Sequence, residues 1–177
     1  MKILFTILFV FACCVENCYS QNEPASVIYL NAIPPEGVLL DKGWKFQKGD
    51  NSDYANANYD DSKWQHINPT LDMQSLFPQI DTSGICWFRL HLSLDSNLIK
   101  APLALMISQT GASEIYVNGK LFKQFGVISA NPASLVTYNP WEKPMAFPVE
   151  NNMAILLSVR YAPERQNKYL NFIRTGY

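Results

Sequence analysis

The sequence has few of the residue types that carry out catalysis. Its 177 residues include two histidines and four cysteines, and three of those cysteines lie within the first 20 positions. No serine stands in the Gly-x-Ser-x-Gly pattern of a nucleophile elbow, and neither phosphate-loop nor dinucleotide glycine spacing occurs. His66, His91 and Cys86 are too scattered along the chain to predict a zinc site. Both histidines lie among aromatic neighbours on predicted strands, where we expect structural or surface roles. The chain alone is predicted not to be an enzyme.

Basic clusters and long apolar runs are also lacking. The net charge is −1 without a basic stripe, which excludes nucleic acid and anionic membranes as natural partners. The apolar run at residues 3–14 is too short to cross a hydrocarbon core of about 30 Å. Lys2 precedes this run, and Cys18-Tyr19-Ser20 offers small residues at the −3 and −1 positions. Residues 1–20 are therefore predicted to be a secretory signal peptide.

Two alternatives to the signal peptide stay open. The first is a buried helix or strand, and the second is lipid attachment at Cys13 or Cys14, because Phe11-Ala12-Cys13 loosely resembles a bacterial lipobox. Cleavage after residue 20 would leave 157 residues, which suits one domain with a real core. Cys86 would then be the only cysteine, so no disulfide would form, and its apolar neighbours predict a buried, unreactive thiol. We expect export to the periplasm or the outer cell surface.

Short runs of alternating apolar and polar residues, joined by turn residues, make up the rest of the chain. Residues 21–42 are a polar, proline-containing segment that leads into a domain predicted over 43–177. Alternation in 87–94 predicts a strand with one buried face, whereas 103–108 is apolar on both faces and predicts an inner strand. No segment shows a helical period. The fold class is therefore predicted to be all-β, an antiparallel β-sandwich of the jelly-roll type, with strands at 43–46, 63–67, 87–94, 103–108, 113–117, 120–125, 145–149 and 154–161.

The stretch EIYVNGKLFKQFG (114–126) contains the clearest local signal. Asn118-Gly119 stands between two alternating runs, and both central residues of a type I′ turn need a positive φ. A two-residue hairpin is therefore predicted. Such a turn fixes the register between two strands but performs no chemistry itself.

Calcium is the one metal for which the sequence offers ligands. Residues 49–62 (GDNSDYANANYDDS) concentrate carboxylate and amide oxygens, which calcium prefers. The EF-hand pattern fails, because Ala55 replaces its glycine and Asp61 replaces its glutamate. Asp and Asn also favour turns without any metal. No cofactor is assigned, and structural calcium stays an alternative, with ligands drawn from Asp50, Asn51, Asp53, Asp60 and Asp61.

Four motifs, taken in their order, resemble a known domain: YDDSKW (59–64), WFRLHLSL (87–94), GASEIYVNGKLFKQFG (111–126) and AILLSVRYA (154–162). Together they resemble the galactose-binding-like jelly roll at the N-terminus of family 2 glycoside hydrolases such as β-galactosidases. The resemblance implies a sugar-binding accessory domain. The catalytic glutamates of that family lie on a later barrel domain, and no barrel pattern is present in this chain.

The motifs are also similar to a variant of this domain at the N-terminus of bacterial membrane sensors, which are histidine kinase or phosphatase receptors. There, GW-x-F-x-x-GD leads into DDS-x-W, G-x-x-WFR, GASE-x-Y and YNP, and this chain has counterparts of each between residues 43 and 140. This resemblance implies a ligand-binding input domain followed by membrane helices and an output domain. We expect the chain to be a fragment of a longer protein, with residues 170–177 beginning a final strand.

Six residues are the candidate ligand contacts: Asp50, Arg89, Glu114, Tyr138, Asn139 and Trp141. Trp141 is the predicted sugar-stacking platform, in a loop with Tyr138 and Asn139. Arg89 is expected either to pair with Glu114 across strands or to bind a ligand carboxylate or hydroxyl. Glu114 lies on the outward face of its strand, where solvation is the usual state.

Packing is the alternative role for each tryptophan. Trp64 and Trp44 are predicted to pack in the core, and Trp87 is expected either beneath a neighbouring segment or at the surface.

Three functional hypotheses follow. The leading one is an exported, non-catalytic input domain of a bacterial membrane receptor that binds carbohydrate or another small ligand. The second is the sugar-binding accessory domain of a family 2 glycoside hydrolase. The third is an interaction module that docks through an exposed patch of Trp87, Tyr116 and Phe122. The expected partners are therefore a small ligand and a C-terminal membrane, output or catalytic region.

Overall fold

The structure, a computed structural model, describes residues 27–71, 84–141, 143–149 and 152–164. Strands dominate this part of the chain, and its only helical elements are short 3-10 turns. This confirms the all-β prediction. The turns are η1 (Ser52–Ala55), η2 (Leu98–Lys100) and η3 (Pro132–Ser134). The strands are β1 (Ile28–Leu30), β2 (Trp44–Lys48), β3 (Gln65–Ile67), β4 (Cys86–Leu94), β5 (Ala104–Leu105), β6 (Gly111–Val117), β7 (Lys120–Phe125), β8 (Met145–Ala146) and β9 (Ala154–Pro163).

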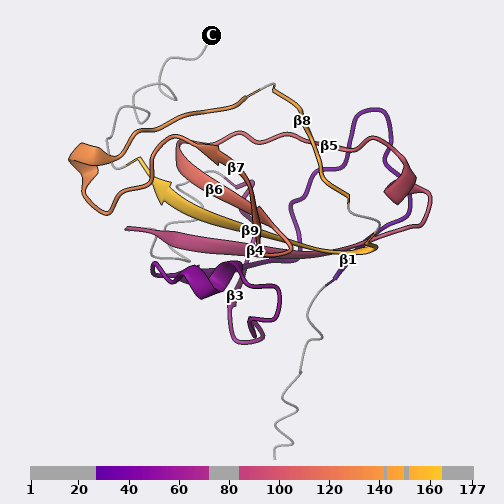
Figure 1. Cartoon of the computed structure of the whole chain (residues 1–177), viewed down its shortest axis with the longest axis horizontal. Helices are drawn as coiled ribbons and strands as arrows, with labels where there is room; N and C mark the ends of the chain where they lie inside the picture. Colours follow the sequence, from indigo (N-terminus) through magenta and orange to yellow (C-terminus); the bar gives the residue numbers. More distant parts are fainter. Residues whose placement is uncertain (1–26, 72–83, 142, 150–151, 165–177) are drawn as a thin grey trace, which may run out of the picture.

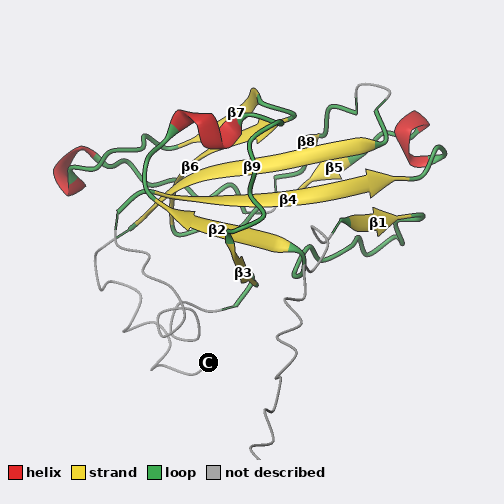
Figure 2. Cartoon of the chain, turned by 90° about the horizontal axis from the view of Figure 1, so that it is seen from below, coloured by secondary structure: helices red, strands yellow, loops and turns green. Residues whose placement is uncertain are grey.

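One large sheet forms the body of the domain. Its strand order is β3-β2-β4-β9-β6-β7, and these strands are antiparallel. β1 is the exception: it pairs in parallel with the end of β4, on the same edge that β2 occupies at the other end (Figure 2). β5 and β8 form a small second sheet over one face of the large one (Figure 1).

The hydrophobic core lies between the two sheets. β4 contributes Leu90, Leu92 and Leu94, and the neighbouring strands contribute Ile115 and Leu157, all of them buried. Alternation of side chains along each strand places these residues on one face. Segments beside β5 and β8 cover that face with partly buried residues, which are Leu103, Leu105, Ile107, Phe147 and Val149. The predicted sandwich is therefore present, with its second layer built largely from loops.

The opposite face of the large sheet is covered by residues 49–64, called here the covering loop. It contains η1 and lies below β4 in Figure 1. Trp64, at the end of this loop, is 6 % exposed, and Trp87, on β4 beneath the loop, is 1 % exposed. Their rings lie edge-on to Tyr54 at 4.9 and 6.0 Å. The prediction of one buried face for β4 was therefore incomplete, because the covering loop buries the second face as well.

The hairpin and most strands agree with the sequence analysis. Asn118 and Gly119 have φ values of 50° and 83°, as a type I′ turn requires, and join β6 to β7. The entry segment 21–42 contains one short strand, β1. One strand prediction was wrong: 103–108 forms only a two-residue strand whose Ala104 is exposed rather than inner.

Several predictions fall outside the described residues. They are the signal peptide at 1–20, lipid attachment at Cys13 or Cys14, and the final strand at 170–177. Within the described residues, no helix has the length and apolar character needed to span a membrane.

Candidate functional site

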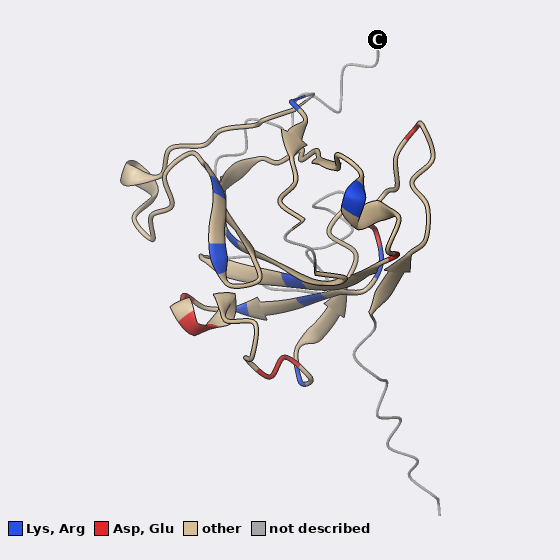
Figure 3. Cartoon of the chain, turned by 45° about the vertical axis from the view of Figure 1, so that its right-hand side comes forward, with Lys and Arg blue, Asp and Glu red and all other residues tan. Residues whose placement is uncertain are grey.

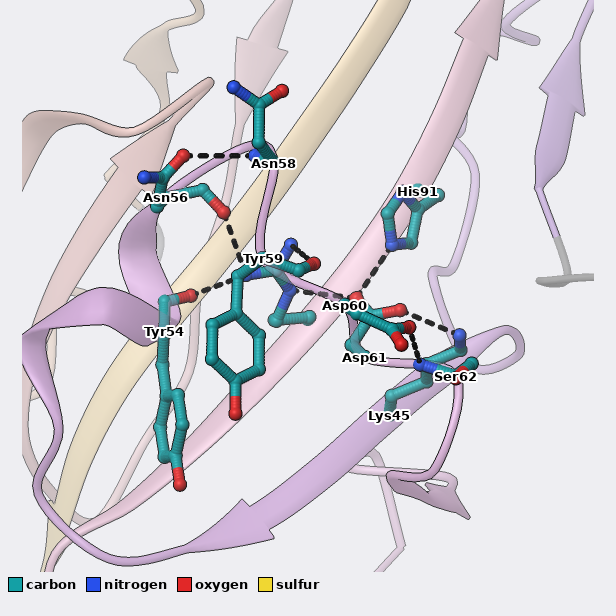
Figure 4. A network of polar contacts seen from close by, with 10 residues as sticks. Lys45, Tyr54, Asn56, Asn58, Tyr59, Asp60, Asp61, Ser62 and His91 are labelled. Atoms are coloured by element: carbon teal, nitrogen blue, oxygen red, sulfur yellow. Dashed lines mark hydrogen bonds and ion pairs between the residues drawn. The ribbon is translucent and has the colours of Figure 1, made fainter.

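A buried group of charged side chains joins the covering loop to the sheet. The carboxylate of Asp61 accepts hydrogen bonds from Lys45 Nζ and Arg89 Nε, each at 2.7 Å, and lies 2.7 Å from His91 Nε2 (Figure 4). Lys45 and Arg89 face each other on β2 and β4, and two cations side by side repel. Asp61, which lies on the covering loop, offsets this repulsion by binding both cations. These four residues are called the Asp61 cluster.

Arg89 holds the covering loop through its backbone as well. Its Nη1 donates to the carbonyl oxygens of Tyr54 and Asn56 at 2.6 and 3.0 Å, and its Nη2 donates to that of Tyr59 at 3.3 Å. Its guanidinium carbon lies 5.7 Å from the ring centroids of both Tyr59 and Trp64. A single planar cation thus binds three carbonyl groups of the loop, which suits the fork of five donors on arginine.

The charge state of Asp61 is determined by these contacts. Burial alone would raise the pKa of its carboxyl group, but the hydrogen bonds from His91 and Lys45 and the charge of Arg89 outweigh burial and hold the pKa well below its usual range. Asp61 is therefore ionised, and its charge is stabilised inside the protein.

The expected pairing of Arg89 with Glu114 was wrong, because the partner of Arg89 is Asp61. Arg89 is fully buried, and its role in this arrangement is structural. Its assignment as a ligand contact stays a prediction that its burial does not favour. His91 has the structural hydrogen bond that was predicted, and His66 is exposed.

A second charged group brings two of the candidate residues together. Arg160 on β9 donates to Asp50 at 2.7 and 2.8 Å and to both carboxylate oxygens of Glu114 at 3.1 Å. Tyr116 Oη donates to the same Glu114 carboxylate at 2.8 Å. The expectation that Glu114 is simply solvated was therefore wrong. We call Asp50, Glu114, Tyr116 and Arg160 the Arg160 cluster.

The contacts within the Arg160 cluster shift two pKa values. Burial and the bond to Glu114 raise the pKa of Tyr116 to about 12. The bonds to Asp50, which outweigh burial, and those to Glu114 raise the pKa of Arg160 further above its already high value. Tyr116 and Arg160 are thus both held protonated at neutral pH.

The acidic residues of the covering loop do not converge on one point. Asp50 pairs with Arg160, Asp61 lies in its own cluster, and Asp60 accepts the backbone N–H of Ser62 at 2.9 Å. Asn51 caps η1 by accepting the N–H of Asp53. Within the described ranges, no group of three acidic, histidine or cysteine side chains is placed to hold a metal ion. The local arrangement is that of turns and ion pairs.

The remaining candidates, Tyr138, Asn139 and Trp141, lie on one loop that is held firmly in place. Asn139 Oδ1 accepts the backbone N–H groups of Trp141 and Gln109 at 3.1 and 3.2 Å. Gln109 Nε2 donates to the Tyr138 carbonyl at 2.8 Å, and the N–H of Lys143 closes a turn onto the Pro140 carbonyl at 3.0 Å. Asn139 thus shapes the loop, and its side-chain oxygen is already used.

Two aromatic rings project from this loop. Trp141 is 65 % exposed and Tyr138 is 42 % exposed, and Tyr138 stacks on Phe125 with the ring centroids 5.9 Å apart. Lys143 Nζ donates to Tyr138 Oη at 2.9 Å. We call Tyr138, Trp141 and Lys143 the aromatic platform. From Gly126 to Trp141 the chain carries no charged residue, and the protruding η3 segment is uniformly tan in Figure 3.

The other tryptophans are packed. Trp44 and Trp64 are buried, as predicted, and Trp87 lies beneath the covering loop. The proposed docking patch of Trp87, Tyr116 and Phe122 does not exist: Trp87 and Tyr116 pack under the covering loop, whereas Phe122 packs against the main core. Cys86 is buried as predicted, and burial raises the pKa of its thiol to about 12.

Sequence reasoning missed three residues that shape these sites, Lys45, Arg160 and Lys143, and considered Asp61 only as a calcium ligand. A signal for Lys45 and Arg160 was present. Alternation places Lys45, Arg89 and Arg160 on the side of their strands opposite the core residues. Three cations on one face of a sheet indicate nearby carboxylates, and the loop at 49–62 supplies them.

Comparison with known proteins places the fold. No family model matches the sequence, and no curated protein matches it. A β-glucuronidase from Bacteroides uniformis matches the structure with a TM-score of 0.51 at 20 % identity, over 72 % of this chain and 14 % of that one. A family 2 glycosyl hydrolase from Bacteroides cellulosilyticus (TM-score 0.47, 20 % identity, 72 % and 18 % covered) and a β-glucuronidase from Bifidobacterium dentium (0.48, 14 %, 67 % and 18 %) are further matches.

This chain therefore spans about one seventh of the Bacteroides uniformis enzyme. The resemblance to the jelly roll of family 2 glycoside hydrolases is confirmed at the level of the fold. The similarity to membrane sensors gains no support from these matches. The chain shares its β-sandwich fold with a small part of a β-glucuronidase.

Proposed function

We propose that this chain is an exported, non-catalytic β-sandwich module of a larger glycosidase of the family 2 type, and that it binds carbohydrate through the aromatic platform. A shared fold that accounts for only 14 % of a β-glucuronidase supports a module within a longer enzyme. In this proposal, bond cleavage is carried out by a different part of that longer protein.

The observation that carries the proposal is the rigid exposure of Trp141. An exposed indole offers an apolar face on which a sugar ring can stack. Asn139 and the turn from Pro140 to Lys143 hold the backbone of Trp141 before any ligand arrives. Binding to a preorganised loop loses less conformational entropy, which favours affinity.

The carboxylates of the two clusters support a non-catalytic role. Glycoside hydrolysis needs two carboxyl groups that face each other across the scissile bond, one of them free to donate a proton. Asp50 and Glu114 are both bound to Arg160, and Asp61 is buried among cationic partners. Each of these groups is therefore engaged in holding the fold together.

A glycan-binding experiment tests the proposal. The purified chain is screened against an array of plant, microbial and host glycans, and the best ligand is titrated by calorimetry. We expect Trp141→Ala to weaken binding by about 5–150-fold, since loss of one stacked ring costs on the order of 1–3 kcal/mol, the range measured for base stacking on aromatic side chains. The control is Tyr29→Ala, which removes a 60 % exposed ring on β1, remote in sequence from the platform.

Two results would contradict the proposal. Equal loss of affinity in Trp141→Ala and Tyr29→Ala would mean that the platform is not the binding site. Hydrolysis of nitrophenyl glycosides by the purified chain, absent from a mock purification, would show that the chain is an enzyme by itself.

A further inference from the structure

Asn118-Gly119 is the only Asn-Gly pair in the chain, and it forms the tip of the hairpin between β6 and β7. An asparagine that precedes glycine is chemically labile, because glycine has no Cβ to hinder the approach of its backbone nitrogen to the asparagine side chain. Asn118 is half-buried and Gly119 is exposed, so water reaches the tip. The hairpin therefore presents a reactive pair to solvent.

Two hydrogen bonds hold Asn118 to β9. Its backbone N–H donates to the carbonyl oxygen of Leu156 at 2.9 Å, and its Oδ1 accepts the N–H of Leu156 at 2.8 Å. The pair extends the antiparallel β6–β9 ladder by one residue beyond Val117 and Leu157, with a side-chain oxygen in place of the backbone carbonyl. β9 and β7 lie on opposite sides of β6. The side chain of Asn118 is therefore drawn toward β9, while its main chain turns toward β7.

We infer that Asn118 is a site of spontaneous deamidation that its bonds to β9 protect, so that the reaction proceeds only when the hairpin tip opens. In the reaction, the backbone nitrogen of Gly119 loses its proton and attacks Cγ of Asn118. The bond from Cγ to the side-chain nitrogen breaks, ammonia leaves with that proton, and a succinimide ring remains. Water then opens the ring at either carbonyl, which gives aspartate or isoaspartate. This inference is independent of the proposed carbohydrate binding.

The two products differ in how well they fit the tip. Aspartate keeps an oxygen that accepts the Leu156 N–H, and its charge strengthens that bond. Isoaspartate adds one carbon to the main chain, about 1.5 Å of length, within a turn of two residues. Gly119 already lies against the covering loop, since a Cβ on it would be 3.5 Å from Ala55 O and 3.7 Å from Ala57 N. The isoaspartyl chain therefore cannot restore both the bonds to Leu156 and the contact with the covering loop.

Peptide mapping by mass spectrometry tests the inference. The purified chain is incubated at mildly alkaline pH, either folded or in concentrated guanidinium chloride, and aspartate and isoaspartate at position 118 are quantified over time. Opening of the tip breaks two hydrogen bonds of ordinary net strength, so the folded chain should react about 5–150-fold more slowly than the unfolded chain. Unfolded Gly119→Ala should react more slowly than the unfolded wild type, because its Cβ hinders the attacking nitrogen.

The stability of the modified chain is the second measurement. The isoaspartyl form, separated by chromatography, should unfold at a lower temperature than the unmodified chain, whereas freshly purified Asn118→Asp should unfold near the wild-type temperature. A folded chain that reacts as fast as the unfolded chain would overturn the protection by Leu156. Absence of product at position 118 in the unfolded chain would overturn the site itself. An isoaspartyl chain as stable as the unmodified one would overturn the predicted misfit at the tip.

Discussion

The covering loop and the loop that bears the aromatic platform are both rich in turn-forming residues, yet they are held in different ways. The covering loop is fastened by buried charged side chains, chiefly Asp61 and Arg89. The platform loop is fastened by backbone groups and two amide side chains, Asn139 and Gln109. In the covering loop the charged side chains are buried and paired, whereas the platform loop leaves the rings of Tyr138 and Trp141 and the ammonium group of Lys143 at the surface.

This difference shows how a loop can be ordered and still remain available to a ligand. A buried ion pair is shielded from water only when the loop that bears one partner lies on the sheet, so this way of fastening a loop also covers the charged side chains. Hydrogen bonds to backbone groups fix a loop without covering its side chains. The charged residues of this domain therefore indicate stability more than function, and the exposed aromatic residues indicate the candidate site.

The largest expected effect is on the covering loop. Asp61→Asn leaves Lys45 and Arg89 buried without a carboxylate, and breaking a buried ion pair on one side costs about 3–5 kcal/mol of the free energy of unfolding. Urea denaturation at pH 7 measures this loss. The matched control is Asp60→Asn, since Asp60 is exposed and accepts a backbone N–H that asparagine can also accept. Equal losses in the two variants would mean that the Asp61 cluster does not fasten the loop.

The difference in the free energy of unfolding between the wild type and Asp61→Asn should depend on pH. The folded-state pKa of Asp61 is lowered, so its contribution to stability is fully present above the unfolded pKa of about 4 and is lost as the pH falls below it. The difference between wild type and Asp61→Asn should therefore narrow below pH 4. A constant difference down to pH 2 would show that Asp61 titrates alike in both states.

A smaller loss of stability is expected at Gly126, which directly follows β7 and begins the segment that leads to the platform. Gly126 has a φ of +75°, and a Cβ there would overlap the carbonyl oxygen of Val136. Gly126→Ala should cost about 2–3 kcal/mol through strain and displacement. Gly119→Ala is the control, because its φ of +83° is equally strained but its Cβ would meet Ala55 O at an ordinary 3.5 Å. The midpoint of thermal unfolding should be lower for Gly126→Ala than for Gly119→Ala. The reverse order would contradict the close approach of the Val136 carbonyl oxygen to Gly126.

Tyr116 offers a spectroscopic test of the covered face. Its pKa is raised to about 12 by burial and by the bond to Glu114, so the unfolded chain ionises first, near pH 10. The contribution of Tyr116 to stability should therefore decline between about pH 10 and about pH 12. An ultraviolet titration of the phenolate should show a late step that Tyr116→Phe removes. A titration in which Tyr116→Phe instead removes a step near pH 10 would contradict the burial of this hydroxyl.

The smallest effect on stability is expected at the platform. Trp141→Ala removes a 65 % exposed ring and should change the free energy of unfolding by less than about 0.5 kcal/mol. Trp64→Ala removes a ring that is 6 % exposed and should cost about 3–5 kcal/mol. Chemical denaturation of the two variants makes the comparison direct. A large loss in Trp141→Ala would mean that this ring packs against the protein, which would weaken the binding proposal.

Local patterns in the sequence predicted the local parts of the fold. Alternation identified β4 and β9, and Asn118-Gly119 identified the hairpin, because the period of a strand and the positive φ of a tight turn depend on neighbouring residues alone. β1 was missed because three residues carry no readable period, and its pairing with Leu92 to Leu94 lies more than 60 positions away.

The candidate site was predicted less completely. Exposure of Trp141 agreed with its position in a proline-flanked loop. The partners of the charged residues could not be read from the sequence, because Arg89 and Asp61 lie 28 residues apart and Arg160 and Asp50 lie 110 apart. Alternation gives the face on which a side chain lies, but only the folded loop determines which carboxylate meets it.

The position of the hairpin tip bears on how the protein can be labelled. A two-residue turn is often chosen for inserting a peptide tag or a fluorophore, since loop tips tolerate added residues. Here, however, the backbone N–H and side-chain oxygen of Asn118 both bond to Leu156, and Gly119 lies against Ala55 of the covering loop. An insert at Asn118-Gly119 would push against η1 and loosen the layer that covers the charged face. The exposed η3 turn (Pro132–Ser134) is the better attachment point for a reporter that must leave the domain undisturbed.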